Sequence, residues 1–156
     1  MNKKGVTLIE LLIVFVIIGI AAALIAPNIP AWLPRYRLRS ATRDIVSTMR
    51  IAQMKAVSNR LPYKVDFTVA PNCYILRYNT GTDLAPDWRD DGARQTAPPG
   101  ITVNIAGLPG GTATFNTDFT CPGGGSIKLL YQKGAVTRGQ KEIVLNPATG
   151  RTTIVE

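Results

Sequence analysis

A single acidic residue lies in the apolar segment near the N-terminus of this 156-residue chain. Glu10 follows the run Lys3-Lys4-Gly5-Val6-Thr7-Leu8-Ile9, and the sixteen residues from Leu11 to Ala26 carry no charge. A charged side chain inside a bilayer costs at least about 2.5 to 3.5 kcal/mol and normally has a nearby partner. The apolar run offers no basic partner, so the available positive charge would be an α-amino group. Cleavage between Gly5 and Val6 would create one four residues before Glu10.

The segment from Lys3 to Pro30 closely resembles type IV prepilins, which have a short basic leader, a Gly before the cleavage point and T-L-I-E-L-L-I-V after it. The resemblance implies cleavage after Gly5 by prepilin peptidase and N-methylation of Val6. It also implies pairing of Glu10 with the N-terminus of a neighbouring subunit during filament assembly. The family usually has Phe at the position of Val6. We therefore expect slow or inconsequential methylation, but normal cleavage, which depends mainly on Gly5.

Two simpler interpretations of the apolar segment are an ordinary secretory signal and a plain membrane anchor. Ala21-Ala22-Ala23 would supply a signal-peptide cleavage site, but Glu10 early in the apolar region argues against it. The twenty-one residues from Val6 to Ala26 are enough for a plain anchor. The position of Glu10 favours the prepilin interpretation.

The two cysteines, Cys73 and Cys121, lie outside the apolar segment. An oxidising periplasm permits a disulfide between them. The alternative is a pair of buried or unpaired thiols, because two cysteines with no histidine near them do not resemble a metal site.

Four aspartates, Asp83, Asp87, Asp90 and Asp91, gather around Trp88 in a predicted loop. Such a loop could hold calcium, but its spacing does not follow the EF-hand pattern and nearby arginines offset the acids, so a solvated loop is favoured. The chain has no histidine and no recognisable nucleophile motif. We therefore predict a protein that is not an enzyme and has no cofactor or metal.

Positive charge is concentrated between Arg35 and Arg60, where seven basic residues face Asp44 alone. This excess of six equals the net charge of the whole chain once Lys3 and Lys4 leave with the leader. Apolar residues at spacings of three and four predict one helix with a buried stripe: Leu38, Ala41, Ile45, Met49, Ala52 and Ala56. The basic faces would be either an electrostatic surface for anionic lipid or nucleic acid, or the solvated side of a helix facing filament neighbours. The second interpretation is favoured because only Tyr36 interleaves with the arginines.

Prolines 27, 30 and 34 separate the apolar segment from the basic helix, so we predict a kink or break there. Asn59 is the predicted end of the helix, because Asn tolerates the left-handed conformation and Pro62 follows.

Short runs rich in β-branched and aromatic residues follow Pro62, with Gly and Pro clusters between them. The predicted strands are 63–69, 73–78, 101–105, 112–115, 127–132, 142–145 and 152–155, with residues 146–150 as the loop of a final hairpin. The predicted fold is α+β, a long N-terminal hydrophobic helix followed by a small antiparallel β-sheet domain. The predicted regions are a leader at 1–5, a helix and its basic continuation at 6–60, and a periplasmic β-rich domain at 61–156.

The arrangement of residues 37–57, the strands that follow and Gly150-Arg151 resemble the GspH/FimT group of minor pseudopilins. Some FimT-like members bind DNA through a basic C-terminal G-R-x-R motif. This chain has Gly150-Arg151-Thr152-Thr153, which keeps the first Arg and lacks the second, so Arg151 is a candidate DNA or anion contact while DNA uptake is disfavoured.

The resemblance leads to a minor pseudopilin of a periplasmic filament in type II protein secretion, with an assembly role. The alternative is a FimT-like minor pilin of a type IV pilus, acting in biogenesis, adhesion or DNA uptake. A membrane-anchored binding module outside any filament is a further interpretation. The implied partners are other pilins, prepilin peptidase, the inner membrane and exported cargo. The implied location is the inner membrane, with one span and a periplasmic domain, and then a periplasmic or cell-surface filament.

Overall fold

The computed structural model describes residues 6–25, 29–68, 71–82, 84–133 and 136–155. The chain divides into two compact units, Met1–Pro34 and Arg35–Glu156. The first unit holds the helix α1 (Leu8–Ile25). A second helix, α2 (Ile29–Asn59), begins in the first unit and continues through the second.

The prolines have different positions relative to the helices. Pro27 and the kink predicted there lie outside the described residues. Pro30 is in the first turn of α2, where a missing amide costs nothing, and Pro34 lies inside the helix. The α2 helix ends at Asn59 as predicted, but the residue in the left-handed conformation is Arg60, with φ of 54°.

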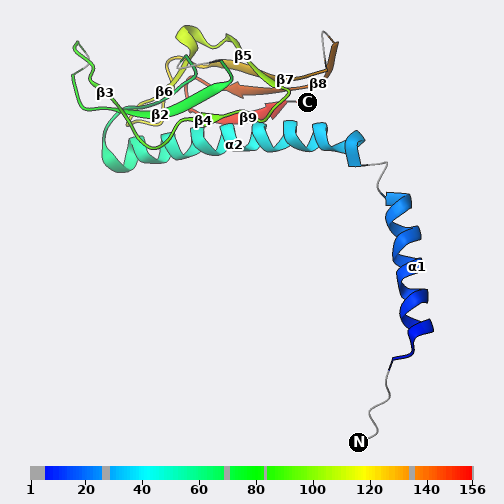
Figure 1. Ribbon diagram of the computed structural model, residues 1–156. Coiled ribbons are helices and arrows are strands. Elements are labelled where there is room, and N and C mark those ends of the chain that lie inside the picture. Colours follow the sequence, from blue (N-terminus) through cyan, green and yellow to red (C-terminus); the bar gives the residue numbers. More distant parts are fainter. Residues whose placement is uncertain (1–5, 26–28, 69–70, 83, 134–135, 156) are drawn as a thin grey trace, which may run out of the picture. The chain divides into compact units, whose positions relative to one another are not determined.

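Figure 1 shows α2 running along one side of the strands of the second unit. The predicted apolar stripe is buried against them, with Leu38, Ala41, Ile45, Met49, Ala52 and Ala56 all at most 5% exposed. Side chains of both sheets complete this core, among them Val65, Phe115 and Leu129. The prediction of one buried helical stripe is confirmed.

The strands form two antiparallel sheets. The first has the order β3-β2-β1-β6, with β4 also paired to β2, and the second has the order β5-β7-β8-β9. The strands are β1 (Tyr63–Asp66), β2 (Cys73–Asn79), β3 (Trp88–Asp90), β4 (Gln95–Thr96), β5 (Ile101–Gly107), β6 (Thr112–Phe115), β7 (Gly125–Lys133), β8 (Val136–Leu145) and β9 (Thr152–Val155). The α+β prediction is confirmed.

All seven predicted strands are present, and β6 and β9 have the predicted bounds. The β8 strand starts at Val136 instead of Glu142, because its polar first half pairs with β7 through a register shift after Tyr131. Strands β3 and β4 were not predicted. The segment 88–90 was expected in a loop, but its residues pair with β2, so that part of the loop prediction is wrong.

Candidate functional site

The first turn of α1 holds Glu10 in a capping box with Thr7. The Thr7 amide and hydroxyl both donate to Glu10 Oε2 at 3.2 Å, and the Glu10 amide donates to Thr7 Oγ1 at 3.3 Å. These bonds satisfy amide groups that a helix start leaves without partners, and they place a carboxylate at the positive end of the helix dipole. The T-x-x-E spacing of Thr7 and Glu10 is a sequence signal for this cap.

The predicted cleavage point precedes this cap. Gly5 lies outside the described residues, whereas Val6 lies in a non-helical segment before Leu8 with its side chain 75% exposed. Val6, on the C-terminal side of the predicted cleavage point, is therefore exposed.

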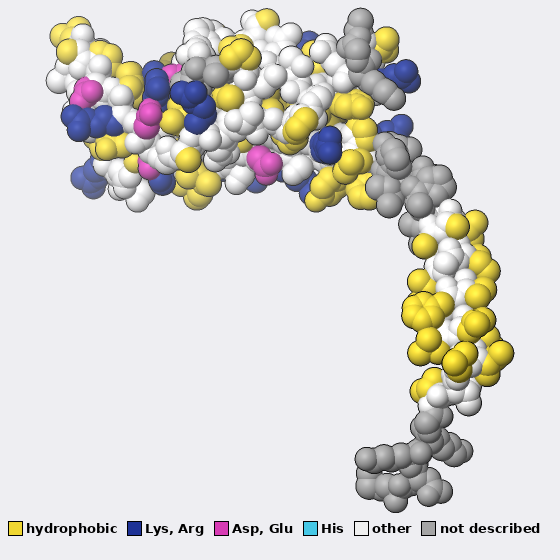
Figure 2. All heavy atoms as spheres, in the orientation of Figure 1, with side chains coloured by type: hydrophobic (Ala, Val, Ile, Leu, Met, Phe, Trp, Pro, Cys, Tyr) yellow, Lys and Arg dark blue, Asp and Glu magenta, His cyan; other side chains and the backbone are white. Residues whose placement is uncertain are grey.

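Apolar side chains surround α1 on every face. Each large apolar side chain from Leu8 to Leu24 is more than half exposed, and hydrophobic side chains cover the part of α1 seen in Figure 2. A helix that is apolar all round needs an apolar environment all round. By the length and hydropathy criteria for a membrane span, none of the helices in the described residues qualifies.

Arg151 lies at the end of the β8–β9 hairpin loop, directly before β9. The loop is closed by the Gly150 amide, which donates to the Asn146 carbonyl at 2.9 Å, and by the Asn146 side chain, which accepts from Ala148. Gly150 has φ of 60°, and a Cβ there would lie 2.6 Å from the Phe119 oxygen. Arg151 is therefore held in a hairpin that continues into a strand.

Both cysteines are free thiols in the structure, and a disulfide between them stays a prediction. Cys73 is the first residue of β2, and its Sγ lies 3.4 Å from the hydroxyl of Thr96 in β4. Cys121 is fully buried, and burial raises the pKa of its thiol to about 11.

The described aspartates near Trp88 form ion pairs with basic side chains. Asp91 accepts from Lys55 at 2.8 Å, and this hydrogen bond raises the pKa of Lys55. Asp90 accepts from Arg77 at 2.7 Å, and Asp87 from Arg89 at 3.0 Å, whereas Asp83 lies outside the described residues. Within the described part of the chain, no group of three or more His, Cys, Asp or Glu could hold a metal ion.

Asp66 is the centre of a buried network of hydrogen bonds and ion pairs that the sequence did not indicate. Its carboxylate accepts from the Thr68 hydroxyl at 2.7 Å and amide at 2.9 Å, and from Arg77 at 2.9 Å. Burial alone would raise the pKa of Asp66. The hydrogen bonds from Thr68 and the charges of Lys64 and Arg77 outweigh burial, so the pKa lies below its ordinary value. Lys64 also lies 4.3 Å from the ring of Trp88. The network joins β1, β2 and β3.

The N-terminus and the fold each match known proteins. The family model of the prokaryotic N-terminal methylation motif matches residues 1–26, which include Gly5, Val6 and Glu10. The fold matches the type IV minor pilin FimU of Pseudomonas aeruginosa with a TM-score of 0.56 at 16% identity, covering 78% of this chain and 90% of FimU. The chain has the N-terminal methylation motif and a pilin-like fold.

A second crystal form of FimU matches with a TM-score of 0.54 and 16% identity, covering 76% of the pilin-like chain and 93% of that structure. No curated protein sequence matches the chain significantly. The motif and the fold are shared features of pilins, and they do not distinguish a type II pseudopilin from a type IV pilus minor pilin.

Proposed function

We propose that this pilin-like chain is a minor subunit of a filament that assembles from the inner membrane, with a structural role and no catalysis. The observation that carries the proposal is α1, whose apolar side chains are exposed on every face and whose one charged residue is Glu10. Lipid would surround α1 before assembly, and the equivalent helices of neighbouring pilins would surround it in the filament. The second unit would lie in the periplasm as the region that meets other subunits or exported cargo.

Processing precedes assembly in this proposal. Prepilin peptidase cuts between Gly5 and Val6, and the new amino group of Val6 is N-methylated. Glu10 then pairs with the N-terminus of a neighbouring subunit, which supplies the positive charge that a carboxylate among apolar helices needs. Thr7 remains in the mature chain, so its hydrogen bonds can hold the Glu10 carboxylate near the helix start until the neighbour arrives.

The filament that we favour is the pseudopilus of type II secretion. In favour of this choice, Arg151 follows the hairpin loop and the next two residues are threonines of β9, so Gly150-Arg151 is not part of a free G-R-x-R motif for DNA. The second candidate is a minor pilin of a type IV pilus, and the likeness to FimU favours it. DNA uptake would be a function of that second candidate.

Secretion assays in a clean deletion strain separate the two candidates. For a pseudopilin, exported enzymes should remain in the periplasm of the deletion strain and reach the medium in its parent. Normal release would contradict the secretion role and direct the search to surface pili and DNA uptake.

The assembly role itself is tested by comparing Glu10→Ala and Glu10→Gln with the parent chain. Mass spectrometry should show that each chain begins at Val6, while both variants should be lost from sheared filaments and accumulate in the membrane fraction. Recovery of Glu10→Ala in filaments at the parental level would contradict pairing through Glu10. It would favour a membrane-anchored module outside any filament if secretion and pilus functions were also intact.

A further inference from the structure

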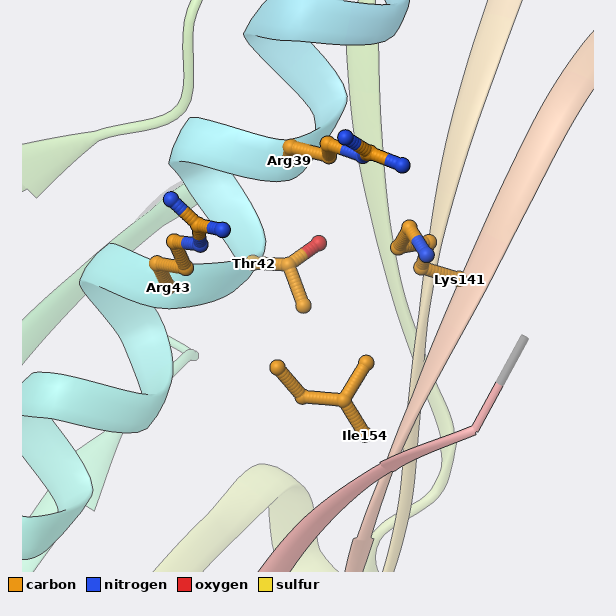
Figure 3. Close-up of a pocket in the computed structure, with 5 residues that line it drawn as sticks. All are labelled: Arg39, Thr42, Arg43, Lys141 and Ile154. Carbon is orange, nitrogen blue, oxygen red and sulfur yellow. The ribbon is translucent and has the colours of Figure 1, made fainter.

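Two adjoining hollows lie between α2 and the strands β8 and β9. The first has a volume of about 460 Å³, and Figure 3 shows Arg39 and Thr42 of α2 extending toward Lys141 across it. The second has a volume of about 450 Å³ and contains Arg151. Ile154 lines both hollows, so they form one groove. We call it the basic groove, lined by Arg39, Thr42, Arg43, Arg50, Gln53, Lys141, Thr149, Arg151, Thr152, Thr153 and Ile154.

Positive charge dominates the basic groove. Four arginines and Lys141 line it, and none of the other described residues that line it is acidic. Lys141 is on the same face of β8 as the buried residues Ile143 and Leu145, whereas Glu142 alternates to the opposite face. Among the described residues, the four arginines form no ion pair with Asp or Glu. The groove therefore suits a ligand that carries several negative charges.

The spacing of the arginines fits an extended peptide. The helix rises about 1.5 Å per residue, so Arg39 and Arg43 are about 6 Å apart along α2, and Arg50 is about 16 Å from Arg39. Side chains on one face of an extended strand repeat at about 6.8 Å. Acidic residues at alternate positions of an extended segment would thus meet Arg39 and Arg43 in succession.

The edge of β9 offers main-chain partners to such a segment. This strand is the last of its sheet, and in the described part of the chain no strand pairs with its outer edge. An unpaired edge accepts an added strand through backbone hydrogen bonds. Ile154, which is 43% exposed, adds an apolar contact beside the arginines.

Two other ligands fit the groove less well. The described residues that line it include no aromatic side chain, so they offer the bases of a single-stranded nucleic acid no stacking surface. A second copy of this chain carries a net charge of +8, or +6 once Lys3 and Lys4 leave with the leader, and repels the groove. Its Asp87, Asp90 and Asp91 already form ion pairs with basic side chains. The occupant should therefore be a different, acidic protein.

We propose that the basic groove binds an extended acidic segment of a different protein, which adds to the edge of β9 and pairs its carboxylates with Arg39 and Arg43. This interaction goes beyond the filament role and holds for either kind of filament.

The test uses the full chain in nonionic detergent and a short fluorescent peptide of alternating Glu and Thr. The peptide should bind, and binding should weaken with added salt. The double variant Arg39→Glu/Arg43→Glu should weaken it by about tenfold or more, because two favourable charge pairs become repulsive. Both arginines are exposed, so the fold should tolerate the change. If the double variant unfolds, Arg39→Gln/Arg43→Gln gives the same comparison without repulsion.

The matched control is Arg94→Glu/Arg138→Glu, which makes the same change of charge at exposed sites outside the groove and should leave peptide affinity within about twofold.

A peptide with N-methylated backbone amides should lose affinity if the segment adds to β9. Equal binding of an alternating Lys and Thr peptide, unchanged binding of the N-methylated peptide, or no binding at all would overturn the proposal. Tighter binding of duplex DNA, lost in the same double variant, would replace the acidic protein with nucleic acid.

Discussion

At the scale of single residues, the environment of Asp66 shows how a buried charge is stabilised. Its carboxylate is 4% exposed and contacts Thr68, Arg77 and Lys64, at the place where β1 and β2 pair. Burying a charge is costly unless its partners are complete, so the loss of the carboxylate leaves buried cationic and polar groups unpaired.

We predict that Asp66→Asn lowers the free energy of unfolding by about 1 to 3 kcal/mol at neutral pH. The folded pKa of Asp66 lies below its ordinary value of 3.8, so its contribution is present above that value and is lost as the pH falls through the folded pKa. The difference between variant and parent should therefore shrink below about pH 4. Urea unfolding at several pH values measures this.

Asp118→Asn is the matched control for Asp66→Asn. Asp118 makes the same turn with a Thr two residues later and accepts from the Thr120 hydroxyl at 2.6 Å, and these hydrogen bonds lower its pKa, but it is exposed. Asp118→Asn should lower the free energy of unfolding much less than Asp66→Asn does. An equal loss in both variants would show that the turn, and not the buried ion pairs, accounts for the stability.

The two thiols should differ in reactivity in the folded protein. A thiolate is the reactive form, and burial raises the pKa of Cys121 to about 11, so it should not be alkylated by iodoacetamide at pH 8 until the protein unfolds. Cys73 is only partly buried and should react in the native state. Mass spectrometry of the alkylated protein, without prior reduction, measures both. If neither cysteine is alkylated before reduction and both are alkylated after it, the two cysteines form a disulfide instead.

At the scale of elements, α2 is stabilised by one buried stripe. Met49 is fully buried, whereas Met54, five residues later, is 62% exposed. The helix thus carries two methionines in opposite environments, which separates the effect of packing from the effect of helix propensity.

We predict that Met49→Ala lowers the free energy of unfolding by about 2 to 5 kcal/mol, because it removes buried atoms and leaves a cavity. Met54→Ala should change it by no more than about 0.5 kcal/mol. Urea unfolding with an unchanged m-value checks both variants. Similar losses at the two positions would mean that helix propensity, not the core, governs the stability of α2.

At the scale of the whole molecule, the buried core lies entirely within Arg35–Glu156. Its first member is Leu38, and none of the α1 residues whose burial is described belongs to it. The first unit should therefore serve filament assembly, whereas the second unit should account for the free energy of unfolding.

We predict that a chain starting at Arg35 folds, remains monomeric without detergent and unfolds cooperatively in urea. Its midpoint should match that of the full chain in detergent, because the full core is retained. Size-exclusion chromatography and urea unfolding measure these properties. Aggregation or a non-cooperative transition would show that α1 is needed for the fold.

The sequence by itself determined the features that depend on neighbouring residues. The apolar segment with Glu10, the stripe from Leu38 to Ala56 and most strands are periodic or local patterns, and the structure has them. The same local information predicted that α2 ends at Asn59, although Arg60 takes the left-handed conformation.

Only the tertiary structure decided the features that join distant residues. The short strands β3 and β4 have too little alternation to be predicted, and pairing with β2 creates them. Asp66 meets Arg77 because β1 pairs with β2 in one register. Arg43 lines the same hollow as Lys141 and Ile154 because α2 packs along the second sheet. Such contacts depend on the register and packing of whole elements, which no local periodicity in the chain encodes.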